Sequence, residues 1–283
     1  MTGLTLHTAD GVRLAARWWQ PPVPPATGEA VVVVHGFCGG KDQPDVESIA
    51  THLAGGGRRV LTFDLRGHGG SEGATTLGLD ERLDVDAAVR TARADADLVV
   101  VVGASMGGIA SIAHLSDGLV AAAAVDGDGH CGRDDVPAAP AAGGDGARAD
   151  GAVVVGTPAL WRVPRSPRGV MAVALTQTRV GRAVTARRLG TRVAVSRGRG
   201  ASPVERIAAV TCPVAVVHGL ADRFVSATAA RLLFEAAPEP RRLDLVPGMG
   251  HGFTAGAEEP VSAAVGWVAG EVARRRGAPR GPA

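Results

Sequence analysis

The sequence predicts an α/β fold with a mostly parallel central sheet, helices on both faces and an inserted cap. Three observations support this. Short runs consist only of apolar residues, as parallel strands buried on both faces require. Helix-like segments separate these runs, which is typical of right-handed crossovers. A long arginine-rich segment interrupts the alternation. The 283 residues, 46% of them hydrophobic, are enough for one large domain with a substantial core.

The elements follow in chain order. Alternating residues over Leu4–Trp18, broken at Asp10-Gly11, predict an amino-terminal hairpin. The apolar runs predicted as strands are Val31–Val34, Val60–Phe63, Leu98–Val102, Ala152–Val155 and Val214–Val217, with a last strand at Leu243–Val246. The helix-like segments are Val46–Leu53, Leu83–Ala94, Gly108–Leu115 and Val261–Arg276.

Two segments depart from this alternation. Gly127–Gly151 is rich in Gly, Ala, Pro and Asp and has no apolar periodicity, which predicts a flexible surface insertion. Thr157–Ser202 holds ten arginines and no acidic residue, so its charge is +10 and that of the remaining chain is −8. A segment inserted here would lie over the carboxyl ends of the strands, where ligands bind in open α/β sheets. We therefore predict a core of residues 1–156 and 203–283 with a cap over 157–202.

Composition excludes several classes of protein. The net charge of +2 averages over these unlike segments and says little about partners, and we expect no nucleic acid among them. Cys38, Cys131 and Cys212 form no CxxC pair, so neither a disulfide framework nor a zinc site is indicated. No stretch approaches the roughly 18 consecutive apolar residues of a membrane-spanning helix, and Met1–Trp19 lacks a signal-peptide pattern. We expect a cytoplasmic protein.

The pentapeptide GASMG, residues Gly103–Gly107, matches the G-x-S-x-G pattern. It follows the apolar run Leu98–Val102 directly and opens the helix-like stretch Gly108–Leu115. A nucleophile elbow requires this strand–turn–helix context, which exposes the serine oxygen at the edge of the sheet. Ser105 is therefore the candidate nucleophile.

An oxyanion needs two backbone N–H donors. One is expected from the residue after the nucleophile, Met106. The other is expected from Phe37 in His35-Gly36-Phe37, which follows the first core strand, because the neighbouring glycines allow close approach. A simple glycine turn is the alternative interpretation. Cys38, beside this loop, is predicted to be a small filler residue.

A serine hydroxyl is a weak nucleophile at neutral pH and needs a base. Of the eight histidines, His251 is best placed, in a glycine-rich loop between the last strand and the last helix. The acid that orients it should follow a late strand. Asp222 in Gly219-Leu220-Ala221-Asp222 fits this position, with Asp126 and Asp128 as reserve candidates. His218 ends a strand and is predicted to be a packed or hydrogen-bonded residue.

With Asp64–Ser71 (DLRGHGGS), these motifs occur in the order typical of α/β-hydrolases, and they span nearly the whole chain outside the insertion and the cap. The chain resembles the capped esterase, lysophospholipase and thioesterase-like branch of that superfamily. The resemblance implies a triad of Ser105, Asp222 and His251 that needs no metal and no organic cofactor. It also implies that Asp64–Ser71 is a structural turn, with Arg66 and His68 as packing residues. A serine at the elbow argues against dehalogenase and epoxide hydrolase chemistry.

The function predicted from these residues is hydrolysis of a small-molecule carboxylic ester or thioester through an acyl-enzyme. Acyl transfer by the same triad and a non-catalytic ligand-binding protein on the same fold are the alternatives. The basic cap could recognise an anionic substrate or an acidic carrier protein, against the alternative of a solvated face produced by arginine-rich composition.

Overall fold

The computed structural model describes residues 2–23, 28–116, 148–161, 167–195 and 200–277. Eight strands form one sheet in the order β1-β2-β4-β3-β5-β6-β7-β8. The first two are antiparallel to their neighbours, and the other six run parallel to one another. The strands are β1 (Thr2–His7), β2 (Arg13–Trp19), β3 (Glu29–Val34), β4 (Arg59–Phe63), β5 (Leu98–Ala104), β6 (Gly151–Val155), β7 (Val214–Gly219) and β8 (Arg241–Val246).

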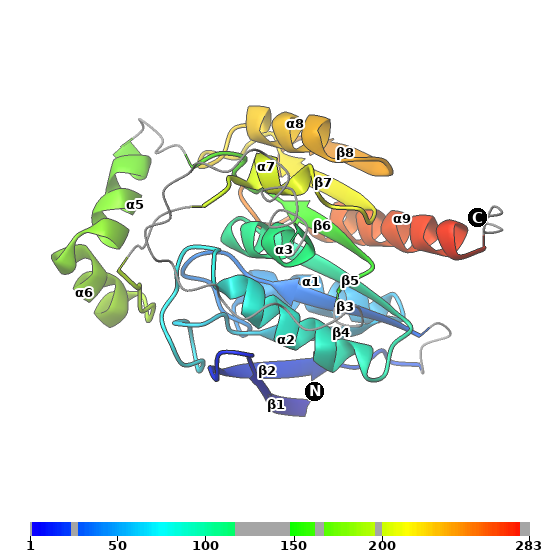
Figure 1. The fold of residues 1–283 in the computed structure, drawn as a ribbon, viewed down its shortest axis with the longest axis horizontal. Coiled ribbons are helices and arrows are strands. Elements are labelled where there is room, and N and C mark those ends of the chain that lie inside the picture. Colours follow the sequence, from blue (N-terminus) through cyan, green and yellow to red (C-terminus); the bar gives the residue numbers. More distant parts are fainter. Residues whose placement is uncertain (1, 24–27, 117–147, 162–166, 196–199, 278–283) are drawn as a thin grey trace, which may run out of the picture.

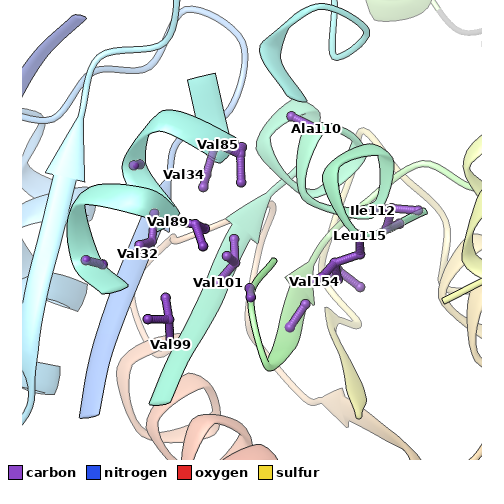
Figure 2. Close-up of a cluster of buried hydrophobic side chains, with 14 of the residues drawn as sticks. Val32, Val34, Val85, Val89, Val99, Val101, Ala110, Ile112, Leu115 and Val154 are labelled. Atoms are coloured by element: carbon purple, nitrogen blue, oxygen red, sulfur yellow. The ribbon is translucent and has the colours of Figure 1, made fainter. Parts of the chain in front are cut away.

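Helices cover both faces of the sheet (Figure 1). On one face lie α2 (Glu81–Arg93), α3 (Met106–Ser116), α7 (Pro203–Ile207) and α8 (Ala227–Ala236), and on the other lie α1 (Pro44–Gly55) and α9 (Glu258–Gly277). This double coverage explains the all-apolar strand sequences. In β3, Val32 and Val34 enter one core while Val31 and Val33 enter the other. Figure 2 shows Val32 and Val34 facing α2 and α3.

The predicted fold is confirmed, including the amino-terminal hairpin and each core strand. The predicted helices are also present, with ends that differ by a few residues. Within the predicted core, two helices, α7 and α8, were not predicted. A capping box between Ser202 and Glu205 begins the short α7. Helix α8 buries Ala230 and Leu233 fully, with Leu232 and Phe234 partly buried against the same core.

Most of the predicted insertion, residues 127–147, lies outside the described residues, but its carboxyl-terminal end is packed on the body. Ala149 is buried, and Gly151 is already the first residue of β6. Asp150 Oδ2 accepts hydrogen bonds from Val99 N at 2.7 Å and from Arg93 at 2.6 Å, while Oδ1 accepts from Arg276 at 2.6 Å. The predicted flexible segment therefore ends before residue 151. Asp150, which the prediction placed inside that segment, is hydrogen-bonded to the start of β5, to α2 and to α9.

Between β6 and β7 the chain forms a pair of helices, α5 (Pro167–Gln177) and α6 (Arg179–Arg188). They pack on each other and stand apart from the sheet at one end of the molecule (Figure 1). The residues after α6 return to the body, where Thr75 and Val193 form an isolated parallel bridge. None of the described helices is both long and apolar enough to cross a membrane.

The contacts of Asp150 predict a measurable effect on stability. Asp150→Ala leaves the partly buried N–H of Val99 without its acceptor, so the free energy of unfolding should fall by about 1–3 kcal/mol. Asp95→Ala is the control, since Asp95 is exposed and pairs with Arg59 at the surface, where such pairs contribute about 1 kcal/mol or less. Urea unfolding measures both, and equal losses would contradict a structural role for Asp150.

Candidate active site

Ser105 lies at the turn between β5 and α3, in the strained conformation that a nucleophile elbow requires. Its φ is +51°, in the left-handed region that residues other than glycine rarely adopt. Its N–H donates to Val155 O at 2.9 Å, and its carbonyl accepts from Gly108 N and Ile109 N in the first turn of the helix. Because these contacts fix the turn on both sides, the strain is held by the surrounding structure.

Glycines flank the elbow because backbone segments approach one another there. A Cβ on Gly107 would lie 2.4 Å from Val34 O, and one on Gly103 would lie 2.5 Å from Gly107 O. Gly36, in the loop after β3, lies in ordinary contact with the elbow, since its Cβ would lie 3.4 Å from that of Ser105. The small residues of the motif are therefore required by packing.

His251 and Asp222 are hydrogen-bonded, with 2.7 Å between Nδ1 and Oδ2. His251 lies in the loop between β8 and α9, and Asp222 follows β7, as predicted. The other carboxylate oxygen of Asp222 accepts from the N–H groups of Phe224 at 2.7 Å and Val225 at 2.9 Å. The Asp222 side chain is fully buried, so three donors hold it in one orientation.

The end of β6 joins this pair to the serine. Val155 accepts the hydrogen bond from Ser105 N, and the next residue is Gly156, with φ +55°. A Cβ on Gly156 would lie 3.4 Å from both Asp222 Oδ2 and His251 Nδ1. The three predicted residues therefore gather at the carboxyl ends of adjacent parallel strands, where this class of sheet binds ligands.

Electrostatics favour an ionised Asp222. Burial alone would raise the pKa of this carboxyl, but the hydrogen bonds from His251 and from the two backbone amides lower it by more, so the pKa lies below its usual value. A carboxylate can only accept hydrogen bonds, so the proton of a neutral His251 resides on Nδ1. That tautomer leaves Nε2 unprotonated and able to act as a base.

The two predicted oxyanion donors lie on either side of the elbow. Met106 is the first residue of α3, where helical N–H groups have no partner within the helix. Phe37 is in the loop after β3 that approaches Ser105 through Gly36. Within the described part of the chain, neither the Phe37 nor the Met106 amide N–H donates to a protein acceptor. Both can therefore donate to a ligand oxygen.

Two buried histidines hold the Phe37 loop. His68 Nε2 accepts from Cys38 N at 3.3 Å, and His68 Nδ1 donates to Arg66 O at 3.0 Å. His35 Nε2 accepts from Leu65 N at 3.0 Å. Burial lowers the pKa of His35 to about 3, assisted by the neighbouring His68, whose own pKa burial also lowers. Both rings are therefore neutral and act as fixed hydrogen-bonding groups, which agrees with the structural role expected for His68.

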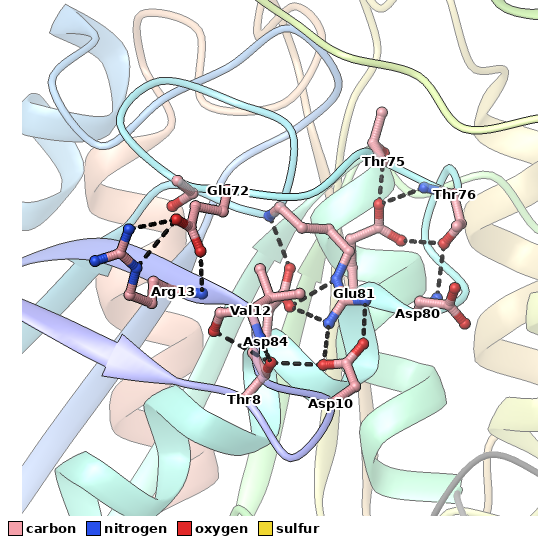
Figure 3. A network of polar contacts seen from close by, with 12 residues as sticks. Thr8, Asp10, Val12, Arg13, Glu72, Thr75, Thr76, Asp80, Glu81 and Asp84 are labelled. Atoms are coloured by element: carbon pink, nitrogen blue, oxygen red, sulfur yellow. Dashed lines mark hydrogen bonds and ion pairs between the residues drawn. The ribbon is translucent and has the colours of Figure 1, made fainter.

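The turn after β4 is fixed by buried carboxylates (Figure 3). Arg66 binds Asp84 through its Nε at 2.8 Å and Asp10 through a second nitrogen, also at 2.8 Å. Glu81 is fully buried and accepts from the hydroxyl groups of Thr75 and Thr76. The Thr75 hydroxyl also lies 3.5 Å from Met106 Sδ. This network thus reaches from the hairpin to the first residue of α3.

Several residues near the site were not predicted as functional. The Phe224 ring lies 5.1 Å from that of His251, and no sequence pattern distinguishes it. Gly156 could have been noticed only as a glycine that ends a core strand. Cys38 has φ +58° and is half-buried, and burial raises the pKa of its thiol, which is consistent with a filler role.

The remaining candidates have simpler roles or lie outside the described residues. His218 is buried at the end of β7, where burial lowers its pKa. It is therefore packed, as predicted. Asp126, Asp128 and Cys131 lie outside the described residues. Within the described residues, no group of three or more His, Cys, Asp or Glu side chains could hold a metal ion.

Comparison with known proteins agrees with this fold. The sequence pattern of the alpha/beta hydrolase family matches residues 31–264, so the chain belongs to that family. The chain is 31% identical to the uncharacterised protein Rv2307c of Mycobacterium tuberculosis over 252 residues, which are 88% of this chain and 71% of the relative.

Solved structures share the fold at lower identity. The esterase Pf2001 of Pyrococcus furiosus superposes with a TM-score of 0.66 at 21% identity, covering 95% of this chain and 90% of that one. Est1E of Butyrivibrio proteoclasticus, with ferulic acid bound, gives a TM-score of 0.61 at 18% identity, covering 96% and 99%. XC6422 of Xanthomonas campestris, an α/β serine hydrolase without a lid, gives 0.57 at 20% identity, covering 99% and 96%.

The neutral state of His35 predicts a pH-dependent stability. Its pKa is about 3 in the folded protein and about 6.5 when unfolded, so between these values the unfolded chain binds one more proton. The free energy of unfolding should therefore fall as pH decreases below 6.5, by about 1.4 kcal/mol per pH unit for this group. His35→Gln cannot titrate, and its stability should decline less steeply from pH 6.5 to 4.5 in urea unfolding. Parallel curves for the two proteins would contradict this assignment.

Proposed function

We propose that this protein is a serine hydrolase that cleaves a carboxylic ester or thioester through an acyl-enzyme intermediate. The observation that carries the proposal is the hydrogen bond between His251 and Asp222, held next to the strained Ser105 by the end of β6. Solved structures with this fold include esterases, which supports an ester as the substrate.

In the proposed reaction, Ser105 Oγ attacks the substrate carbonyl while His251 Nε2 accepts the hydroxyl proton. The negative charge that develops on the carbonyl oxygen is stabilised by the N–H groups of Phe37 and Met106, which have no protein acceptor among the described residues. His251 then returns the proton to the leaving alcohol or thiol. Asp222 fixes the imidazole and stabilises its cation.

Hydrolysis of the acyl-enzyme repeats these steps with water as the nucleophile. His251 takes a proton from water, the hydroxide adds to the acyl carbonyl, and Ser105 leaves with that proton. An alcohol or amine could replace water, which would make the protein an acyltransferase. A purely ligand-binding protein is disfavoured, because it has no need of a buried carboxylate aligned with a histidine beside a strained serine.

The nucleophile is tested by labelling. Wild-type protein should react with a fluorophosphonate probe and hydrolyse p-nitrophenyl esters, whereas Ser105→Ala should stay unlabelled and lose more than about a thousandfold in kcat/KM. Ser262→Ala, a substitution in α9, is the matched control and should behave as wild type. Unchanged labelling of Ser105→Ala would assign the nucleophile elsewhere.

The acid is tested by an isosteric change. Asp222→Asn should lower kcat by about 10⁴-fold, because the amide stabilises the wrong imidazole tautomer. Asp244→Asn, in the neighbouring strand β8, should retain activity. If Asp222→Asn is nearly silent and Asp126→Asn is not, the acid of the triad is Asp126.

A substrate panel separates the reaction classes. It comprises p-nitrophenyl esters of increasing acyl length, acyl-CoA thioesters and a lysophospholipid, each assayed with and without an added alcohol acceptor. Release of free acid identifies a hydrolase, and acyl transfer to the acceptor identifies the acyltransferase.

A further inference from the structure

Most of the exposed large apolar side chains lie in two segments of the chain. Of the eight in the part of the chain that the structure describes, five lie between residues 171 and 195, and two lie in the loop of Asp222. Those in the first group are Met171, Val180, Val184, Leu189 and Val195, those in the second are Leu220 and Phe224, and the remaining one is Val23. Single exposed apolar residues are ordinary, but a concentration of them marks an interaction surface.

Helix α6 turns its apolar side chains away from the protein. Gly181 and Thr185 face α5: Gly181 leaves no room for a Cβ beside Ala174, and the Thr185 hydroxyl donates to Leu175 O at 3.2 Å. On an adjoining face of the helix, at the positions just before Gly181 and Thr185, Val180 is 75% exposed and Val184 is 42% exposed. A surface helix ordinarily presents a polar face to water. The orientation of α6 leaves apolar area that the described chain does not cover.

Arginines surround these valines. Arg179, Arg187 and Arg188 are exposed, and in the described part of the chain no carboxylate lies within ion-pairing distance of them. Residues 157–202 contain no aspartate or glutamate, so the segment cannot neutralise its own charge. The helix thus combines exposed apolar side chains with uncompensated positive charge on one surface.

We propose that this surface, formed by Val180, Val184, Arg179, Arg187 and Arg188, docks on an anionic lipid bilayer. A bilayer interface can bind both the valines and the arginines of this surface. Its acyl chains take up apolar side chains, while its anionic headgroups attract arginine. An acidic soluble protein would match the charge alone. Residues 167–195 contain no aromatic side chain, so this surface lacks the Trp and Tyr anchors that are enriched, together with arginine, at specific protein interfaces.

This docking does not depend on the chemistry proposed for Ser105. If that chemistry holds, the exposed Phe224 ring next to His251 suits an amphiphilic ester drawn from the membrane. Failure of the triad would leave the docking surface unaffected. The two proposals are therefore tested separately, with binding measured on the Ser105→Ala protein.

Binding is measured by co-sedimentation of full-length Ser105→Ala protein with vesicles. Vesicles of phosphatidylcholine containing about one third phosphatidylglycerol should bind the protein, and vesicles of phosphatidylcholine alone should bind it at least tenfold less. Raising the salt from about 0.1 to 1 M shortens the screening length from about 10 to 3 Å and should release the protein.

Surface variants and matched controls locate the contact. Arg187→Gln with Arg188→Gln should weaken binding by roughly 25-fold, at about fivefold per arginine near an anionic surface. Val180→Ser with Val184→Ser should also weaken it, by roughly tenfold. The controls are Arg231→Gln on α8 and Val23→Ser, which alter an exposed arginine and a 69% exposed valine elsewhere and should bind as the parent protein. Thermal unfolding verifies that each variant is folded.

Three results would overturn the proposal. The first is absence of binding to anionic vesicles, and the second is an equal loss in the variants and their controls. The third is complex formation with an acidic acyl carrier protein in gel filtration without vesicle binding, which would assign the surface to a soluble partner.

Discussion

The geometry of this site depends on the close approach of three backbone segments around Ser105. Gly107 lies against the Val34 and His35 carbonyls, and Gly103 lies against Gly107, with no space for a Cβ at either position. This contact sets the distance between β3, β5 and α3. The loop after β3 and the start of α3 are consequently held on opposite sides of the serine, where two N–H groups can converge. The strain at φ +51° persists because the packing around it is so dense.

The buried charges of the 64–84 region serve the same geometry. Arg66, Asp84 and Glu81 are almost inaccessible to water, which is costly for polar groups, but each has hydrogen-bond partners in this region. Removing one partner would leave a charge buried alone, so the turn has few alternative conformations. That rigidity extends through Thr75 to Met106 and through His68 to Cys38, the two sides of the candidate oxyanion site.

The parts of the structure that could be predicted are those that depend on residues close together in the sequence. Strands buried on both faces appear as uninterrupted valine runs, and the elbow requires its small residues within one pentapeptide. The positions of Asp222 and His251 follow from chain order relative to those strands. Contacts between residues far apart in the sequence produce no local pattern. The hydrogen bonds of Asp150 with Arg93 and Arg276, and that of Asp10 with Arg66, depend on tertiary structure alone. The boundary at residue 151 was misplaced because Asp150 lies in a low-complexity stretch, although its carboxylate accepts a hydrogen bond from the buried Val99.

Positive and negative charges are separated along this chain, and the small net charge does not reveal that separation. The segment over residues 157–202 has a charge of +10, and the remaining chain has −8. Helices α5 and α6 stand apart from the sheet, at one end of the molecule (Figure 1). At physiological ionic strength, exposed charges interact over about 8 Å, so an anionic surface near α6 experiences those arginines and little of the acidic body. If the acidic remainder of the molecule approaches an anionic surface first, the two negative charges repel each other. A protein with this distribution therefore meets an anionic surface with α6 foremost, although its total charge of +2 would predict almost no attraction.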